Sequence, residues 1–136
     1  MMQFLPKFSI NPPLSDSEAL KLNPITLAFI GDCVHTLYER TRAALENEGE
    51  DTNVLNALVA AEVKAVSQAK KIEKALPTLS ETESEIFRKA RNAKIHTSAK
   101  HASIGEYRYA SGFEAVIGYL YLTGKTERLF ELLEKR

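Results

Sequence analysis

The chain has 136 residues, of which 44% are apolar, with 18 basic and 18 acidic residues that cancel to a net charge of zero. This composition is typical of one soluble globular domain and excludes a chain-wide positive charge, so nucleic-acid binding would need a local basic patch. The single cysteine, Cys33, excludes an internal disulfide and a four-cysteine zinc site, and it favours a reducing, cytoplasmic location. No apolar run reaches membrane-spanning length, so we expect no membrane contact.

Proline interrupts the first 14 residues, which predicts an extended N-terminal arm (residues 1–14) ahead of one domain (residues 15–136). Phe4, Leu5, Phe8 and Ile10 suit docking of this arm on the domain or on a partner subunit, and fraying is the alternative. Beyond the arm, apolar residues recur at helical spacing and β-branched alternation is scarce. The sequence therefore predicts an all-α fold, a compact helical bundle.

Capping signals indicate where several helices begin. Ser15 with Glu18, and Ser80 with Glu83, match the capping box. Asn23 precedes a proline suited to the first helical position. The expected helices are a short one from Asp16, a long one from Pro24 to about Asn47, one or two capped by Asn53 and reaching about Leu76, one from Ser80 to about Ala93, and two at about 107–122 and 126–135, with a loop at 94–106.

Two acidic residues, Asp32 and Glu114, lie beside the apolar stripes of two expected helices, and small residues surround both of them. Gly31 precedes the first acid, and Gly118 lies one turn after the second. A glycine inside a helix costs about 1 kcal/mol relative to alanine, which is easier to understand if another backbone or a ligand comes close. The stripes are Leu27, Ile30, Val34, Leu37 and Leu45 on the first helix, and Tyr109, Phe113, Val116, Ile117 and Leu120 on the second.

Two carboxylates that meet at a helix crossing repel each other, and a Mg²⁺ ion between them removes this repulsion. Mg²⁺ takes oxygen ligands and keeps several waters. It also lowers the pKa of a bound water and stabilises charge at a phosphorus under attack. Asp32 and Glu114 are therefore candidate metal ligands. The alternative is two unrelated, half-exposed acids, or an acid paired with an arginine.

Residues 88–108 form a basic segment, with six basic residues against Glu106 and a net charge of +5 in a neutral chain. The helix dipole accounts for cations at the end of the preceding helix, but not for their continuation into a loop rich in Ser, Thr, Lys and His. Such a loop suits phosphates, and double-stranded RNA is recognised mainly through shape, phosphates and 2′-hydroxyls. An incidental basic loop is the alternative.

Other candidate sites are weaker. Cys33 and His35 face different directions on a helix, which argues against a Cys–His nucleophile pair, and we expect Cys33 to be a small core residue. The three histidines lack the spacing of zinc ligands, and the sequence has no glycine-rich phosphate loop.

Several segments in order resemble the ribonuclease III family. FIGDCVH (residues 29–35) resembles its signature helix, and GFEAVIGYLYL (residues 112–122) resembles its second characteristic helix. LAFIGD, NVLNALVAAEVKAVSQAK, RNAK and YRYASGFEAVIGYLYL appear in the order and spacing of the Mini-ribonuclease III subfamily, a short bacterial version of the family. The resemblance covers roughly residues 20–135.

The resemblance implies a homodimeric, all-α endonuclease in which Mg²⁺-activated water cuts double-stranded RNA and leaves 5′-phosphate and 3′-hydroxyl ends. Mn²⁺ is the expected substitute ion. Asp32 and Glu114 match the family's essential acids, which implies catalytic and metal-binding roles for both. The implied substrate is a stem of precursor large-subunit (23S) ribosomal RNA, presented with a ribosomal protein.

The sequence departs from full-length ribonuclease III at two positions, because Ala28 and Ser111 stand where that family has a glutamate and an aspartate. Both changes are also typical of the Mini subfamily. Two carboxylates then remain, and we expect a more hydrated Mg²⁺. Ser111 is expected to contact the metal through a water or to serve in helix packing.

The homodimer and the RNA are each expected to contact a particular part of the chain. We expect the dimer surface on the long helix and around residues 54–66. A non-catalytic RNA- or ribosome-binding module on the same fold is the alternative, which the presence of both acids disfavours. The residues expected to contact RNA are Arg88, Arg91, Asn92, Lys94, Lys100 and Arg108.

Overall fold

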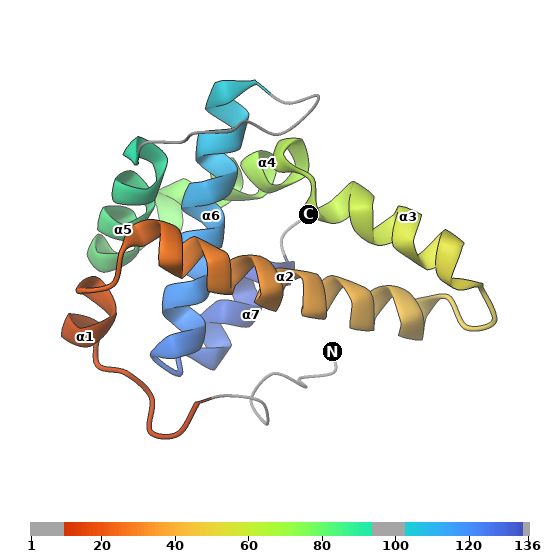
Figure 1. Cartoon of the computed structure of the whole chain (residues 1–136), viewed down its shortest axis with the longest axis horizontal. Helices are drawn as coiled ribbons and strands as arrows, with labels where there is room; N and C mark the ends of the chain where they lie inside the picture. Colours follow the sequence, from red (N-terminus) through yellow and green to blue (C-terminus); the bar gives the residue numbers. More distant parts are fainter. Residues whose placement is uncertain (1–9, 94–102, 135–136) are drawn as a thin grey trace.

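The computed structural model describes residues 10–93 and 103–134, and all regular elements in this part of the chain are helices. Helix α6 (Ile104–Leu122) lies at the centre and is buried on most sides. Helix α2 (Pro24–Glu46) crosses it, while α4 (Ala65–Ala75) and α5 (Glu81–Asn92) pack against it (Figure 1). The other elements are α1 (Asp16–Leu20), α3 (Thr52–Val63), the 3₁₀ helix η2 (Leu76–Thr78) and α7 (Thr126–Glu134). The expected all-α bundle is confirmed.

Local capping explains most of the helix starts, as the sequence predicted. Ser15 and Ser80 each accept a hydrogen bond in a complete capping box, at the starts of α1 and α5. Asn23 accepts the backbone N–H of Ile25 at 2.8 Å, ahead of Pro24 at the start of α2. Gly124 ends the α6 region in the left-handed conformation, with φ of 70°.

Two expected boundaries were wrong. Asp51, not Asn53, caps α3, because its carboxylate accepts the N–H of Val54 at 3.1 Å. Of the one or two helices expected from there to about Leu76, the structure has two, α3 and α4, which are separated by the extended backbone of Lys64. Ser103 forms a capping box that starts α6 at Ile104, so residues 104–106 are helical, and the rest of the expected loop (residues 94–102) lies outside the described residues.

The apolar stripe expected on α2 is only partly correct. Leu27 and Val34 are buried, but Leu37 and Leu45 are 37% and 49% exposed. Small and polar residues of α2, including His35, are buried as well, because α6 packs against α2. Cys33 is exposed, so its expected core position was wrong. On α6 the expected stripe is confirmed, with Phe113, Val116, Ile117 and Leu120 fully buried and Tyr109 partly buried.

The end of the arm packs on the bundle. The backbone N–H of Leu14 donates to the carbonyl oxygen of Leu122 at 2.8 Å, and Ile10 and Leu14 contact the core. The more N-terminal apolar residues of the arm, Phe4, Leu5 and Phe8, lie outside the described residues. Among the helices of residues 10–93 and 103–134, none is long and apolar enough to cross a membrane.

Candidate active site

Two glycines let α2 and α6 cross with their backbones in direct contact. A Cβ atom on Gly31 would overlap the carbonyl oxygen of Glu114, and a Cβ atom on Gly118 would overlap the carbonyl oxygen of Leu27. Any larger residue at either position would therefore push the helices apart. The expectation that the mid-helix glycine next to Asp32 admits another backbone is confirmed.

This crossing brings the two expected acids together. Asp32 directly follows Gly31 on α2, and its side chain is hydrogen-bonded to that of Glu114 on α6. The Asp32 side chain is exposed and that of Glu114 is partly buried, so the pair is open to solvent on one side. The structure thus rules out the interpretation of the two acids as unrelated.

The Glu114 carboxyl group retains its proton at neutral pH. Burial of Glu114, with the hydrogen bond and negative charge of Asp32, raises the pKa of Glu114 to about 9. A divalent cation would replace this proton and remove the repulsion, which fits two oxygen donors beside solvent. Among the described residues, no cluster of three or more His, Cys, Asp and Glu side chains is arranged to hold a metal. Asp32 and Glu114 would hold such an ion mainly with water.

Gln68 belongs to this site and was missed in the sequence. It lies on α4, is 3% exposed, and its side chain is hydrogen-bonded to Glu114, which opposes the rise in the pKa of that carboxyl group. Its Nε2 also donates to the carbonyl oxygen of Val63 at 2.6 Å. The available signal was weak: Gln68 stands at helical spacing with Ile72 and Ala75, which are both fully buried, so a polar side chain shares a buried face.

The other predicted site residues lie around the acids at different distances. Ser111 is buried one turn before Glu114 on α6. Arg108 is exposed six residues before Glu114, about 9 Å along the helix axis.

The end of α5 and the start of α6 lie at the same end of the bundle (Figure 1). Arg88 and Asn92 are exposed there, and Arg91 lies over the ring of Phe87 at 5.6 Å while its Nε donates to the Asn92 side chain at 3.2 Å. Of the described RNA-binding candidates, Arg88, Arg91 and Asn92 thus lie at the end of α5, and Arg108 lies in the first two turns of α6. Lys94 and Lys100 lie outside the described residues.

A second polar cluster lies between α2, α3 and α4. Lys71 Nζ lies 2.8 Å from His35 Nε2, and it lies 3.6 Å and 3.7 Å from carboxylate oxygens of Glu39 and Glu62. Burial and the charge of Lys71 lower the pKa of His35 to about 3, so its ring is neutral. This cluster ties the three helices together.

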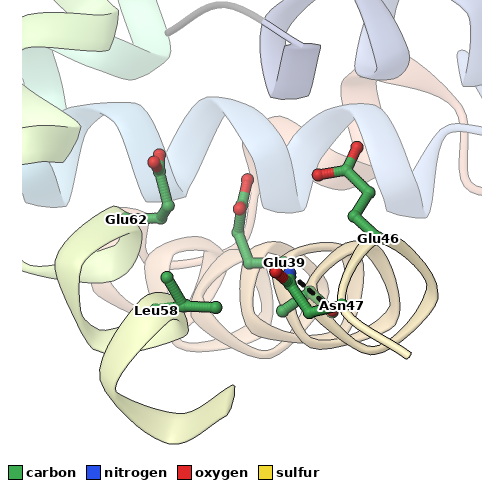
Figure 2. Close-up of a pocket in the computed structure, with 6 residues that line it drawn as sticks. Glu39, Glu46, Asn47, Leu58 and Glu62 are labelled. Carbon is green, nitrogen blue, oxygen red and sulfur yellow. Dashed lines mark hydrogen bonds between the residues drawn. The ribbon is translucent and has the colours of Figure 1, made fainter. Parts of the chain in front are cut away.

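A cavity of about 110 Å³ opens beside this second cluster. Figure 2 shows the carboxylates of Glu39, Glu46 and Glu62 on the same side of it. Each of these carboxylates has a basic neighbour, because Lys71 lies beside Glu39 and Glu62, and Arg42 pairs with Glu46 at 3.2 Å. The lining residues are Glu39, Ala43, Glu46, Asn47, Leu58 and Glu62.

Comparisons with known proteins show the family of this chain. The family model of the Ribonuclease III domain matches residues 25–125, which include both acids. Mini-ribonuclease 3 of Thermoanaerobacter sp. (strain X514) is 42% identical over 134 residues, covering 98% of this chain and 92% of that protein. Mini-ribonuclease 3 of Clostridium tetani (strain Massachusetts / E88) is 39% identical over 128 residues, covering 94% and 85%.

The fold also has a solved neighbour. A crystal structure of a protein from Fusobacterium nucleatum matches with a TM-score of 0.76 and 30% sequence identity, covering 83% of this chain and 89% of that chain. The family model covers most of the chain, and the relatives align over nearly their whole length. The chain therefore belongs to the ribonuclease III family, in its Mini-ribonuclease 3 branch, and is an endoribonuclease.

Proposed function

We propose that this endoribonuclease hydrolyses double-stranded RNA in a Mg²⁺-dependent reaction at Asp32 and Glu114, leaving 5′-phosphate and 3′-hydroxyl ends. The observation that carries the proposal is the meeting of two acids from separate helices, at a glycine crossing that only small residues permit. Family membership supports RNA as the substrate.

The two acids have different tasks in this proposal. Asp32 is exposed and can approach the scissile phosphate, whereas Glu114 is partly buried and gives up its proton when the site is loaded. Mg²⁺, with Mn²⁺ as its substitute, supplies an activated water and stabilises the charge at phosphorus when bound. Ser111, one turn from Glu114, is assigned to a water of the ion.

The RNA is proposed to approach at the end of the bundle that carries Arg88, Arg91, Asn92 and Arg108. Lys94 and Lys100, which lie outside the described residues, are proposed to contact RNA as well. Exposed guanidinium and amide groups there suit phosphates and 2′-hydroxyls, which are shared by all double-stranded RNA. The proposed natural substrate is a stem of precursor 23S ribosomal RNA, presented in the cytoplasm with a ribosomal protein.

A homodimer is proposed to form through the exposed apolar side chains of α2 and α3. Phe29 is 73% exposed and lies three residues before Asp32, on the same helix. Leu37 and Leu45 are further exposed apolar residues of α2, and Val54 and Leu58 are exposed on α3. An apolar surface of this kind marks a protein interface, and here it would place two active sites in one assembly.

The proposal is tested by incubating the protein with long double-stranded RNA, with and without Mg²⁺, beside Asp32→Asn, Glu114→Gln and the exposed control Glu50→Gln. We expect Mg²⁺-dependent cutting by the wild type and by Glu50→Gln, and none by the two site variants with their folds intact. Cutting that survives either site variant would place the chemistry elsewhere. Binding without cutting by the wild type would favour the non-catalytic module.

A further inference from the structure

The amide group of Gln68 connects the junction between α3 and α4 to the active-site acid of α6. The backbone is extended at Lys64, and α3 ends with carbonyl groups that need partners outside the helix. Gln68 Nε2 donates to one of them, the carbonyl oxygen of Val63, at 2.6 Å. Because this nitrogen carries two hydrogens, it can also serve the Glu114 carboxylate, to which the Gln68 side chain is hydrogen-bonded.

The oxygen of the same amide group points to a further ligand. Gln68 Oε1 is buried, and no described residue donates a hydrogen bond to it. Leaving a buried acceptor unsatisfied costs about 1–3 kcal/mol, so buried polar atoms normally have a partner. The two amide heteroatoms share one carbon, which keeps this oxygen close to the Glu114 carboxylate. A water of a hydrated cation at Asp32 and Glu114 is a partner of the right chemistry.

We propose that Gln68 is a positioning residue of the active site, which holds the Glu114 carboxylate through its amide nitrogen and accepts a hydrogen bond from a cation-bound water through its amide oxygen. The inference rests on the proposed Mg²⁺-dependent function. It also accounts for a site with two carboxylates: a third helix, α4, adds a neutral oxygen next to the ion's water shell.

The test replaces Gln68 by methionine, which has nearly the same size and no amide. Removal of such an outer contact typically weakens metal affinity or activity by about 10–100-fold. We expect Gln68→Met to need roughly tenfold more Mg²⁺, or more, for half-maximal cutting of double-stranded RNA. Mn²⁺ binding without RNA, measured by electron paramagnetic resonance, should weaken to a similar extent.

Ser67→Ala is the matched control, because Ser67 Oγ donates to the carbonyl oxygen of Ala61 at 2.6 Å across the same helix junction. Its Mg²⁺ requirement should match that of the wild type. Equal responses of the two variants, or an unchanged requirement in Gln68→Met, would overturn the inference.

Two further outcomes are a Gln68→Met variant that does not fold and a wild type that does not cut RNA. If circular dichroism shows that Gln68→Met does not fold, Gln68→Asn takes its place, because its shorter side chain draws the amide away from Glu114. A Mg²⁺ requirement of Gln68→Asn equal to that of the wild type would overturn the inference. If the wild type cuts no RNA with Mg²⁺, the proposed function fails, while Mn²⁺ binding still decides on Gln68: equal Mn²⁺ affinity in Gln68→Met and wild type would overturn its role.

Discussion

The Glu114 carboxyl group has opposite effects on folding and on the proposed catalysis. Its pKa is about 9 in the folded chain against an ordinary value of 4.5, so between these pH values the folded state retains a proton that the unfolded state has lost. The free energy of unfolding therefore falls as the pH rises from 4.5 to 9. We expect Glu114→Gln, which cannot ionise, to be more stable than the wild type at pH 8 without Mg²⁺, by on the order of 1–3 kcal/mol in urea unfolding.

The exposed control Glu50→Gln should match the wild type in the same experiment. The advantage of Glu114→Gln should vanish near pH 4, where both states of the wild type hold the proton. Added Mg²⁺ should reduce the advantage at pH 8, because the ion stabilises the ionised pair. Equal stability of Glu114→Gln and wild type at pH 8 would contradict the raised pKa.

At the scale of helices, the crossing of α2 and α6 depends on the absence of side chains at Gly31 and Gly118. The atoms that a methyl group would meet are backbone atoms, which cannot rotate away. We expect Gly31→Ala to lower the free energy of unfolding by about 1–3 kcal/mol or more, as overpacking does. It should also abolish cutting, because the two acids separate when the helices move apart.

Gly105→Ala provides the contrast within α6, since among the described residues a Cβ atom there meets only Ser103 Oγ, at an ordinary 3.8 Å. Its stability should be unchanged or slightly higher, because alanine favours the helix over glycine. Thermal or urea unfolding of the two variants, with circular dichroism of the folded state, measures both. Similar destabilisation by the two substitutions would mean that helix propensity, and not the crossing, decides.

At the scale of the whole molecule, the proposed dimer should depend on Phe29. A charged side chain at this exposed apolar position would be buried without a partner in the interface, which is strongly unfavourable. We expect Phe29→Glu to sediment as a monomer at concentrations where the wild type is a dimer, and to cut double-stranded RNA more slowly. Ile104→Glu, at another exposed apolar residue (65% exposed), should leave the oligomeric state unchanged. A dimer in Phe29→Glu would exclude this surface.

Several helix starts are set by hydrogen bonds between residues that are close together in the sequence. Ser15, Asn23 and Ser80 cap their helices through contacts two or three residues away, so these starts are visible in the sequence. The cap of α3 was not predicted correctly, because Asp51, Thr52 and Asn53 are all favourable N-cap residues. Only the backbone conformation decides which of them caps the helix.

The sequence by itself determined the fold class and most helices, because periodicity and capping act between residues a few positions apart. It also named Asp32 and Glu114 as candidates, because family motifs can be read in chain order. Tertiary structure alone decided that Asp32 meets Glu114 and raises the pKa of that carboxyl group, and that Gln68 joins them. It also decided that Leu37 is exposed where periodicity favoured burial. Burial and hydrogen bonding between helices depend on which faces meet, and residues far apart in the chain set those contacts only after it folds.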